Sequence, residues 1–459
     1  MIGKETLLTT LSAALKSSGA DQTEIIVEAT HQGVSRYAGS QLHQTTVLDD
    51  LTVGVRAVVG QAVGQAIGAS FRPDDLRGLI EQATAVARIK EPNPEFVSLA
   101  EPEAAEAVDG FDAETASMHA EARAEAIGAI VARSAERGWT VSGTYLTEGR
   151  ELAVVNSLGI AAYAPSSMAF LRALPDSGRT PFGAQVGTGY ADALSYRAAD
   201  LDPVEVAERA MTRCELNHDQ QEIAPGEYEA IFEDLCVAEA LFYLARFGFS
   251  GRAFEEGTSF MSERLGERVT GKNVTIWDDG TDPRGLAVAA DHEGVPKRKT
   301  PLIVAGVAQG VTYDSYTAHR AGRRSTGNAA GRDITAFEPV PTNLFMAGGD
   351  ASIQDMIRAT TRGLLLTRFH YTHGPDPKRV VMTGTTRDGT FLIENGEITG
   401  AVKNLRLTQA VPELFEGIEL LGKPRLCRDW WCINGMGRLS CVCPPVKVRR
   451  AVFSSGTLF

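Results

Sequence analysis

The chain has 459 residues, of which 43% are apolar and 22% charged, and its formal net charge is −13. This acidic balance argues against a nucleic-acid binder, because such proteins need a density of basic side chains to meet phosphate. The length exceeds what one hydrophobic core usually organises, so we expect two domains. No apolar run approaches the roughly 20 residues of a membrane span, and residues 1–20 lack the layout of a signal peptide. The sequence therefore predicts a cytoplasmic protein without a membrane segment.

The first half of the chain alternates strand patterns with helical ones. Strands are expected within residues 23–70, and a helix begins at Pro73, where proline suits the first helical turn. An alanine-rich helix over residues 112–137, four strands within residues 140–189 and a helix from Pro203 complete this part. The pattern predicts an α+β domain in which helices accompany an antiparallel sheet.

Strand patterns dominate after the polar segment 217–226, which supplies the best domain boundary. The exceptions are a helix over residues 234–246 and a short helix that begins at Ser352. We therefore expect two domains in an α+β chain: an N-terminal α+β domain, residues 1–220, and a strand-rich, barrel-like C-terminal domain, residues 221–459.

The short helix is the best-defined element of the second half. Ser352 and Asp355 have the spacing of a capping box, which predicts a helix start. Gly363 is expected to close this helix, because glycine often follows the last helical turn. The apolar run from Leu364 to Tyr371 is short enough for a buried strand.

The stretch from Met346 to Val402, which contains this helix, also carries a family resemblance. Its glycine pair Gly348-Gly349, its short helix, its Arg-Gly-Leu-Leu-Leu-Thr-Arg-Phe strand and its Glu-Asn-Gly-Glu-Ile hairpin resemble the C-terminal domain of the TldD/PmbA family. The resemblance implies a two-subunit peptidase. In that family the TldD subunit carries a zinc site, whereas the PmbA subunit, also called TldE, has a similar fold and lacks the metal motif.

The helix over residues 234–246 decides which subunit type the chain resembles. Zinc-bearing members have a His-Glu-x-x-x-His motif there, with two zinc ligands and a glutamate as general base. In this sequence Phe242, Tyr243 and Phe247 occupy those three positions, and phenylalanine has no lone pair for a metal. The resemblance therefore implies no catalytic residue, no metal ligand and no cofactor in this chain, with zinc expected in a partner subunit.

Two further groups could suggest a metal site. Cysteines gather near the end of the chain, at Cys427, Cys432, Cys441 and Cys443, but their spacing is not that of a zinc ribbon. Cys432 falls at about the place of the third zinc ligand in metal-bearing members, where alone it is a remnant. Small buried side chains are the simpler interpretation, and whether the cluster binds anything stays open. The Asp291-His292-Glu293 triplet lies in an expected loop, where neighbours rarely converge on one ion.

A basic segment points to the metal-free subunit type. Residues 313–329 closely resemble the PmbA/TldE version of this region, and a positive patch stands within them at His319, Arg320, Arg323 and Arg324. Such a patch can pair with acids of another subunit or with a peptide carboxylate. We expect it at an interface or a peptide-binding surface, and the alternative is a solvated loop.

The sequence thus predicts a PmbA/TldE-type subunit that completes the chamber around a partner's zinc site and accepts extended or unfolded peptides. The chain itself is expected to be non-catalytic, with a TldD-like partner and no nucleic-acid or membrane partner. Two alternatives remain: a peptidase active alone through an unrecognised site, and a homo-oligomer that binds peptides without cleaving them. The isolated chain is also compatible with a homodimer.

Overall fold

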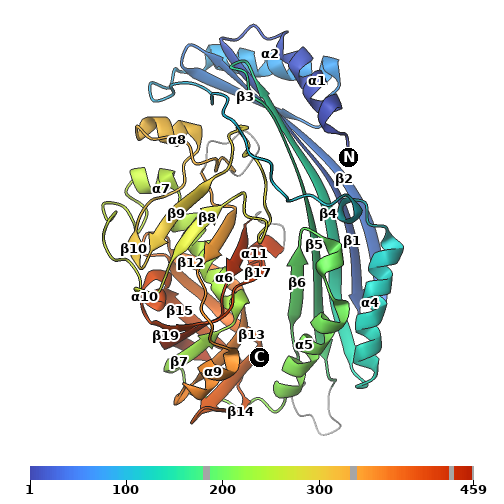
Figure 1. Ribbon diagram of the computed structural model, residues 1–459, viewed down its shortest axis with the longest axis vertical. Helices are drawn as coiled ribbons and strands as arrows, with labels where there is room; N and C mark the ends of the chain where they lie inside the picture. The colour runs from blue at the N-terminus through green and yellow to red at the C-terminus, as the bar shows by residue number, and fades with distance from the viewer. Residues whose placement is uncertain (179–186, 331–338, 434–438, 457–459) are drawn as a thin grey trace.

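The computed structural model describes residues 1–178, 187–330, 339–433 and 439–456, which contain one N-terminal sheet and two C-terminal sheets (Figure 1). The predicted α+β class is confirmed, as are the antiparallel N-terminal sheet and the barrel-like C-terminal part. The boundary expected at residue 220 stays a prediction. Among the described residues, no helix is both long and apolar enough to cross a membrane.

The N-terminal sheet has the strand order β3-β2-β1-β4-β5-β6 and is antiparallel throughout. A two-residue loop at Gly39 and Ser40 joins its first two strands, and both residues have the positive φ that such hairpin loops need. The strands are β1 (Gln22–Ala38), β2 (Gln41–Val59), β3 (Ala62–Gly68), β4 (Thr140–Asn156), β5 (Ala161–Asp176) and β6 (Ala191–Ser195).

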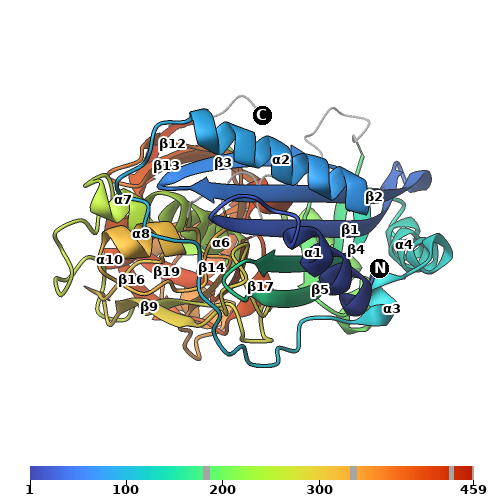
Figure 2. The same cartoon turned by 90° about the horizontal axis from the view of Figure 1, so that it is seen from above.

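Helices cover one face of this sheet, and the C-terminal elements cover part of the other (Figure 2). On the helical face, Leu7 and Leu76 pack against Val27 and Val55. This packing removes the four apolar side chains from water, which stabilises the fold. On the opposite face, Val154 packs with Val295 of the C-terminal part. The elements are α1 (Lys4–Leu15), α2 (Pro73–Ile89), α3 (Ala113–Ala116), α4 (Ala120–Ala135), η1 (Ala198–Asp200) and α5 (Pro203–Leu216).

Two predictions for this half were wrong in detail. The expected helix over residues 112–137 is interrupted, because Asp112 caps a separate short helix by accepting from the Thr115 amide. Within the described part of residues 140–189, the expected four strands are two long strands, β4 and β5, and β6 follows after this segment. Gly149 lies inside β4, where a Cβ would stand 2.5 Å from the Ala116 Cβ. It marks close packing rather than a turn.

The C-terminal part contains a closed barrel of five strands, in which β12-β7-β19-β15-β13 is completed by pairing of β13 with β12. Two shorter strands, β14 and β16, extend it. The barrel elements are β7 (Gly226–Phe232), β12 (Arg362–Asp376), β13 (Val381–Glu394), β14 (Glu397–Ala401), β15 (Leu405–Ala410), β16 (Ile418–Leu421) and β19 (Val446–Gly456).

The third sheet has the order β10-β9-β8-β11-β18-β17. Its strands are β8 (Ile276–Asp279), β9 (Lys299–Val304), β10 (Val307–Ala308), β11 (Asn343–Met346), β17 (Arg425–Cys427) and β18 (Ser440–Cys443). The helices of this half are α6 (Asp234–Tyr243), the π-turn η2 (Leu244–Gly248), α7 (Gly251–Glu255), α8 (Ser315–Arg320), α9 (Ile353–Arg358), α10 (Val411–Glu416) and α11 (Trp430–Ile433).

The capping box at the start of α9 is confirmed: the Ser352 hydroxyl accepts from the Asp355 amide, and the Asp355 carboxylate accepts from the Ser352 amide. The expected end of this helix was wrong, because α9 stops at Arg358 and Gly363 lies in β12. A Cβ on Gly363 would stand 2.6 Å from the Glu229 carbonyl oxygen of neighbouring β7. Here glycine permits close strand contact.

A buried acidic junction joins β1 and β2 to two C-terminal loops. Arg56 donates to Glu24 at 2.6 Å and to Glu293 at 3.4 Å, and all three side chains are almost wholly buried. The Asp314 carboxyl faces the same group. Burial is the main cause that raises the pKa of Glu24 to about 7, of Asp291 to about 7 and of Asp314 to about 6.

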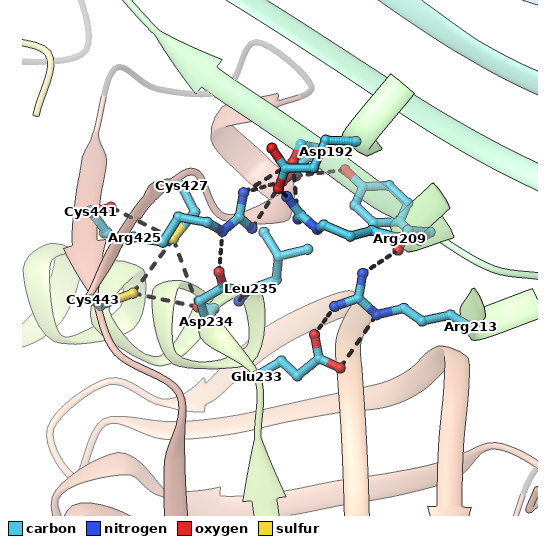
Figure 3. Close-up of polar contacts among 12 residues, drawn as sticks. Asp192, Arg209, Arg213, Glu233, Asp234, Leu235, Arg425, Cys427, Cys441 and Cys443 are labelled. Carbon is cyan, nitrogen blue, oxygen red and sulfur yellow. Dashed lines mark hydrogen bonds and ion pairs between the residues drawn. The ribbon is translucent and has the colours of Figure 1, made fainter. Parts of the chain in front are cut away.

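A second polar connection centres on Arg425 of β17 (Figure 3). Its guanidinium donates to the Asp192 carboxylate of β6 at 3.1 Å and to Asp234 at the start of α6. Beside it, Arg213 of α5 pairs with Glu233. Burial is the largest single cause and would raise the pKa of Asp234, but the charge and hydrogen bond of Arg425, together with the charges of Arg213 and Arg209, outweigh it and hold that pKa below its usual value. The N-terminal sheet is thus tied directly to α6.

The junction predicts a pH dependence of stability. Between about pH 4 and pH 7 the folded chain keeps protons on these raised-pKa carboxyls that the unfolded chain has released, so stability falls as pH rises through this window. We expect the melting temperature to be lower at pH 8.0 than at pH 5.5, and Glu24→Gln to shrink this difference. Glu91→Gln, at an exposed carboxyl, is the control and should leave the difference unchanged. An equal difference in wild type and Glu24→Gln would contradict the prediction.

The Arg425 connection predicts a large loss on truncation. Arg425→Met leaves Asp192 and Asp234 largely buried without their counter-charge, and we expect it to lower the free energy of unfolding by about 2–4 kcal/mol. The matched control is Arg450→Met, whose exposed pair with Glu227 should be worth about 1 kcal/mol or less. Denaturant unfolding of the full chain checks both variants. Equal losses would show that the Arg425 pairs are not structurally special.

Candidate functional site

The helix that carries the motif positions is buried on all sides. From Leu235 to Leu241 every side chain of α6 is buried, including Glu239 at 2% exposure. A helix that is apolar all round belongs to a core. The regular α-helix ends at Tyr243, and a π-turn from Leu244 to Gly248 follows, so the expected helix to residue 246 is corrected in its last turn. Such wide turns occur mostly as single turns and often at functional sites.

The π-turn has a geometric consequence for the motif. Residues five apart on a regular α-helix are rotated by about 140° from one another, because each residue turns the helix by about 100°. A π-turn, with its i→i+5 hydrogen bonds, brings such residues closer to one side. The Phe249 amide donates to the Leu244 carbonyl at 2.9 Å in this pattern. Phe242 and Phe247, which have the spacing of the two family histidines, therefore flank Tyr243 in one aromatic group.

The three rings pack together where metal ligands would stand. The Tyr243 ring lies 5.3 Å from that of Phe242 and 5.9 Å from that of Phe247, centroid to centroid. Both phenylalanines are partly buried and contact the main C-terminal core. Gly374 of β12 makes room, because a Cβ there would stand 2.4 Å from the Phe247 ring. Both phenylalanines therefore serve packing.

The Tyr243 hydroxyl connects these rings to a compact polar network. The Tyr243 hydroxyl donates to the Thr372 Oγ1 at 3.0 Å, and the Trp431 indole N–H approaches both, at 2.9 Å from Thr372 and 3.2 Å from Tyr243. The Thr372 hydroxyl donates to the buried Glu239 carboxylate. Burial, as the largest cause, raises the pKa of Tyr243 to about 12, so its hydroxyl stays protonated.

Cys432 stands beside this network without the properties of a zinc ligand. Its thiol is 2% exposed, and burial first and the Asp429 carboxyl second raise its pKa well above the usual value. A thiol binds zinc as the thiolate, which this environment disfavours. Asp429 accepts from the amides of Trp431 and Cys432, at 2.9 and 3.0 Å.

These residues do not fit the zinc that metal-bearing members of the family carry at this helix. Phe242 and Phe247 offer no donor atom, and the hydroxyl of Tyr243 is occupied by Thr372 and Trp431. Within residues 1–178, 187–330, 339–433 and 439–456, no three His, Cys, Asp or Glu side chains group as metal ligands would. We derive no zinc chemistry at this helix.

The other three cysteines near the end of the chain, Cys427, Cys441 and Cys443, form a separate buried group at the Arg425 connection (Figure 3). Cys427 lies opposite Cys441 across β17 and β18, and its sulfur is 3.5 Å from that of Cys443. Cys443 also donates to the Asp234 carbonyl at 3.4 Å. All three are at most 1% exposed. They fill space between β18 and the start of α6, as small apolar side chains do.

The Asp291-His292-Glu293 triplet belongs to the interior, not to an ion site. Glu293 accepts from Arg56 and from Ser315, and His292 lies 3.0 Å from the Arg150 guanidinium. The side chains thus point to different partners.

The four residues of the basic patch differ in whether they form ion pairs. Arg320 pairs with Glu95 at 3.2 Å, and Arg324 pairs with Glu103, both acids lying on the connection between α2 and α3. His319 and Arg323 are exposed, and neither has an ion-pair partner among the described residues. Two arginines therefore hold the chain's own connection in place, and the expected interface or peptide-binding role of the patch stays a prediction.

Sequence reasoning missed the polar network and its aromatic neighbours. Glu239 is buried and accepts a hydrogen bond from the Thr372 hydroxyl. Tyr371 and His373, on β12 next to Thr372, gave no motif signal. Only the alternation of aromatic and threonine residues in β12 could have pointed to them.

Comparison with known proteins places the chain. Residues 225–455 match the family model described as the PmbA/TldA metallopeptidase C-terminal domain. Two relatives are TldD homologues named as metalloproteases. That from Buchnera aphidicola is 28% identical over 45% of this chain and 43% of its own length. That from Haemophilus influenzae is 31% identical over 40% of this chain and 36% of its own. The matched region thus spans less than half the length of either relative.

The fold as a whole has a solved counterpart. The crystal structure of TldE from Thermococcus kodakarensis superposes with a TM-score of 0.85 over 98% of this chain and 99% of its own, at 22% sequence identity. At this identity the likeness shows the fold alone. The family model covers half of the sequence, and the chain therefore belongs to the PmbA/TldD metallopeptidase family.

Proposed function

We propose that this chain is the metal-free, PmbA/TldE-type subunit of a two-subunit zinc peptidase of the cytoplasm. Its role is to dock on a zinc-bearing TldD-like subunit, complete the chamber around the partner's site and hold extended peptides. The observation that carries the proposal is the filled motif: Phe242, Tyr243 and Phe247 stand at the ligand and base positions, fixed by packing and by Thr372 and Trp431.

The surroundings of these residues support the same proposal. Replacing a ligand by a phenylalanine that packs against the core stabilises the subunit, since complete burial of a large apolar side chain contributes roughly 1.5–3 kcal/mol and the partial burial here contributes a share of that. The strand-rich C-terminal part also suits extended peptides, because pairing through the backbone needs no particular side-chain sequence.

The test of this proposal is reconstitution. The full chain is mixed with a TldD-like subunit of the same organism that carries the His-Glu-x-x-x-His motif, and assembly and cleavage of an unfolded peptide are measured. We expect a stable complex, and cleavage only by the mixture or more strongly by the mixture than by the partner alone. Substitution of the partner's motif glutamate should abolish cleavage, whereas Tyr243→Phe in this chain should leave it. Cleavage by this chain alone would overturn the proposal in favour of an independent peptidase.

The filled motif also predicts that restoring its three residues is not enough. The triple change Phe242→His, Tyr243→Glu and Phe247→His brings a new carboxylate close to buried Glu239 and leaves Cys432 as a protonated thiol. Because supporting groups commonly change metal affinity by about 10–100-fold, we expect less than about a tenth of an equivalent of zinc after dialysis. Metal analysis of the variant beside wild type checks this, and stoichiometric zinc would show that the site needs only its ligands.

The unpaired members of the basic patch give a test of assembly. His319→Ala with Arg323→Ala removes exposed charge that binds nothing else in the described chain, so the subunit should stay folded while its association with the partner weakens, most clearly at low salt. Arg72→Ala, at an exposed arginine of the N-terminal part, is the control. Co-elution over a salt series measures the effect, and unchanged association would make the patch a solvated loop.

A further inference from the structure

Three aromatic side chains form a row at the surface beside the filled motif. The ring of Tyr371 lies 4.8 Å from that of His373 at an interplanar angle of 89°, and the ring of His373 lies 6.0 Å from that of Trp431 at 63°. Such edge-to-face geometry is preferred by aromatic pairs. We call these three residues the aromatic row.

The outer end of the row is pushed out by the backbone. In the pairing of β12 with β13, His370 lies opposite Thr385 and His373 opposite Thr383, so β12 carries one extra residue between them. A β-bulge of this kind re-aims a side chain, and bulges gather next to functional sites. Tyr371 has φ of +51°, an uncommon value for an aromatic residue, and is 58% exposed.

Trp431, at the other end of the row, is held in place by hydrogen bonds. The Trp431 indole N–H reaches both the Thr372 hydroxyl and the Tyr243 hydroxyl, and Thr372 in turn is held by Glu239. The indole therefore keeps one orientation without a ligand. A row of rings that is oriented in advance loses little freedom when another ring or an apolar side chain joins it.

We propose that the aromatic row is a recognition subsite for an aromatic side chain of an extended peptide. This rests on the proposed function, because it assigns a part of the peptide to a part of this subunit. The peptide is favoured over a folded surface for two reasons. The row stands directly beside the residues that replace the zinc motif, because Trp431 donates to Tyr243. Its exposed part is small, the rings of Tyr371 and His373, which suits one inserted side chain rather than a folded surface.

The test uses the full chain without its partner and two labelled, unstructured decapeptides that differ only in one central residue, Phe or Ala. An aromatic contact of the usual strength gives a roughly 2–13-fold preference. We expect wild type to bind the Phe peptide at least about 3-fold more tightly by fluorescence anisotropy. Tyr371→Ala should reduce the preference to less than about 1.5-fold, whereas Tyr371→Phe should keep it, since the ring and not the hydroxyl makes the contact.

The control variant is Ile89→Ala, which truncates an exposed apolar side chain at the end of α2, away from β12, and should keep the preference. Equal binding of both peptides by wild type, or an unchanged preference in Tyr371→Ala, would overturn the inference. A Tyr371→Ala chain that keeps the peptide preference but no longer associates with the zinc subunit would assign the row to the partner instead. Because the binding assay contains no partner, failure of assembly would refute the proposed function and leave this inference to be judged on its own.

Discussion

The ion pairs of Arg425 hold the molecule in its working arrangement. One guanidinium joins β6 of the first sheet, through Asp192, to the first residue of α6, Asp234. Helix α6 contains Tyr243 and leads directly into the π-turn, so this guanidinium helps to fix the orientation of the candidate site relative to the N-terminal sheet. Charges this sheltered from water are costly unless they are paired, and so the two halves cannot separate at this point without exposing them.

The buried acidic junction joins the N-terminal sheet to the C-terminal part at a second place, with a different ratio of acidic to basic side chains. Around Arg56 stand Glu24, Glu293 and Asp314, more acid than base, in a region closed to solvent. Proton uptake there relieves repulsion, whereas the Arg425 group carries matched charges. The acidic junction is therefore most stable at the lower pH values at which its carboxyls keep their protons, whereas the lowered pKa of Asp234 keeps its pair with Arg425 charged until the pH falls below the usual range of a carboxyl.

Local patterns in the sequence were sufficient for much of the fold and for little of the site. The capping box at Ser352 acts between residues three apart, and so it could be recognised without knowledge of the fold. Gly363 was misleading as a helix end, because it permits close contact with Glu229 in a distant segment. The sequence shows phenylalanine at position 242 of the motif, but it does not show which residues hold Tyr243 in place. Thr372 and Trp431 lie far along the chain from Tyr243, and only the fold brings them to it.

The π-turn after Tyr243 separates the path of the backbone from the identity of the side chains that it presents. Residues five apart come to the same side of a helix where it widens, and Phe242 and Phe247 are five apart across this turn. The turn is held by its own backbone hydrogen bonds, such as that from the Phe249 amide to the Leu244 carbonyl. Side chains of other chemistry at these two positions would therefore be brought to the same side by the same backbone.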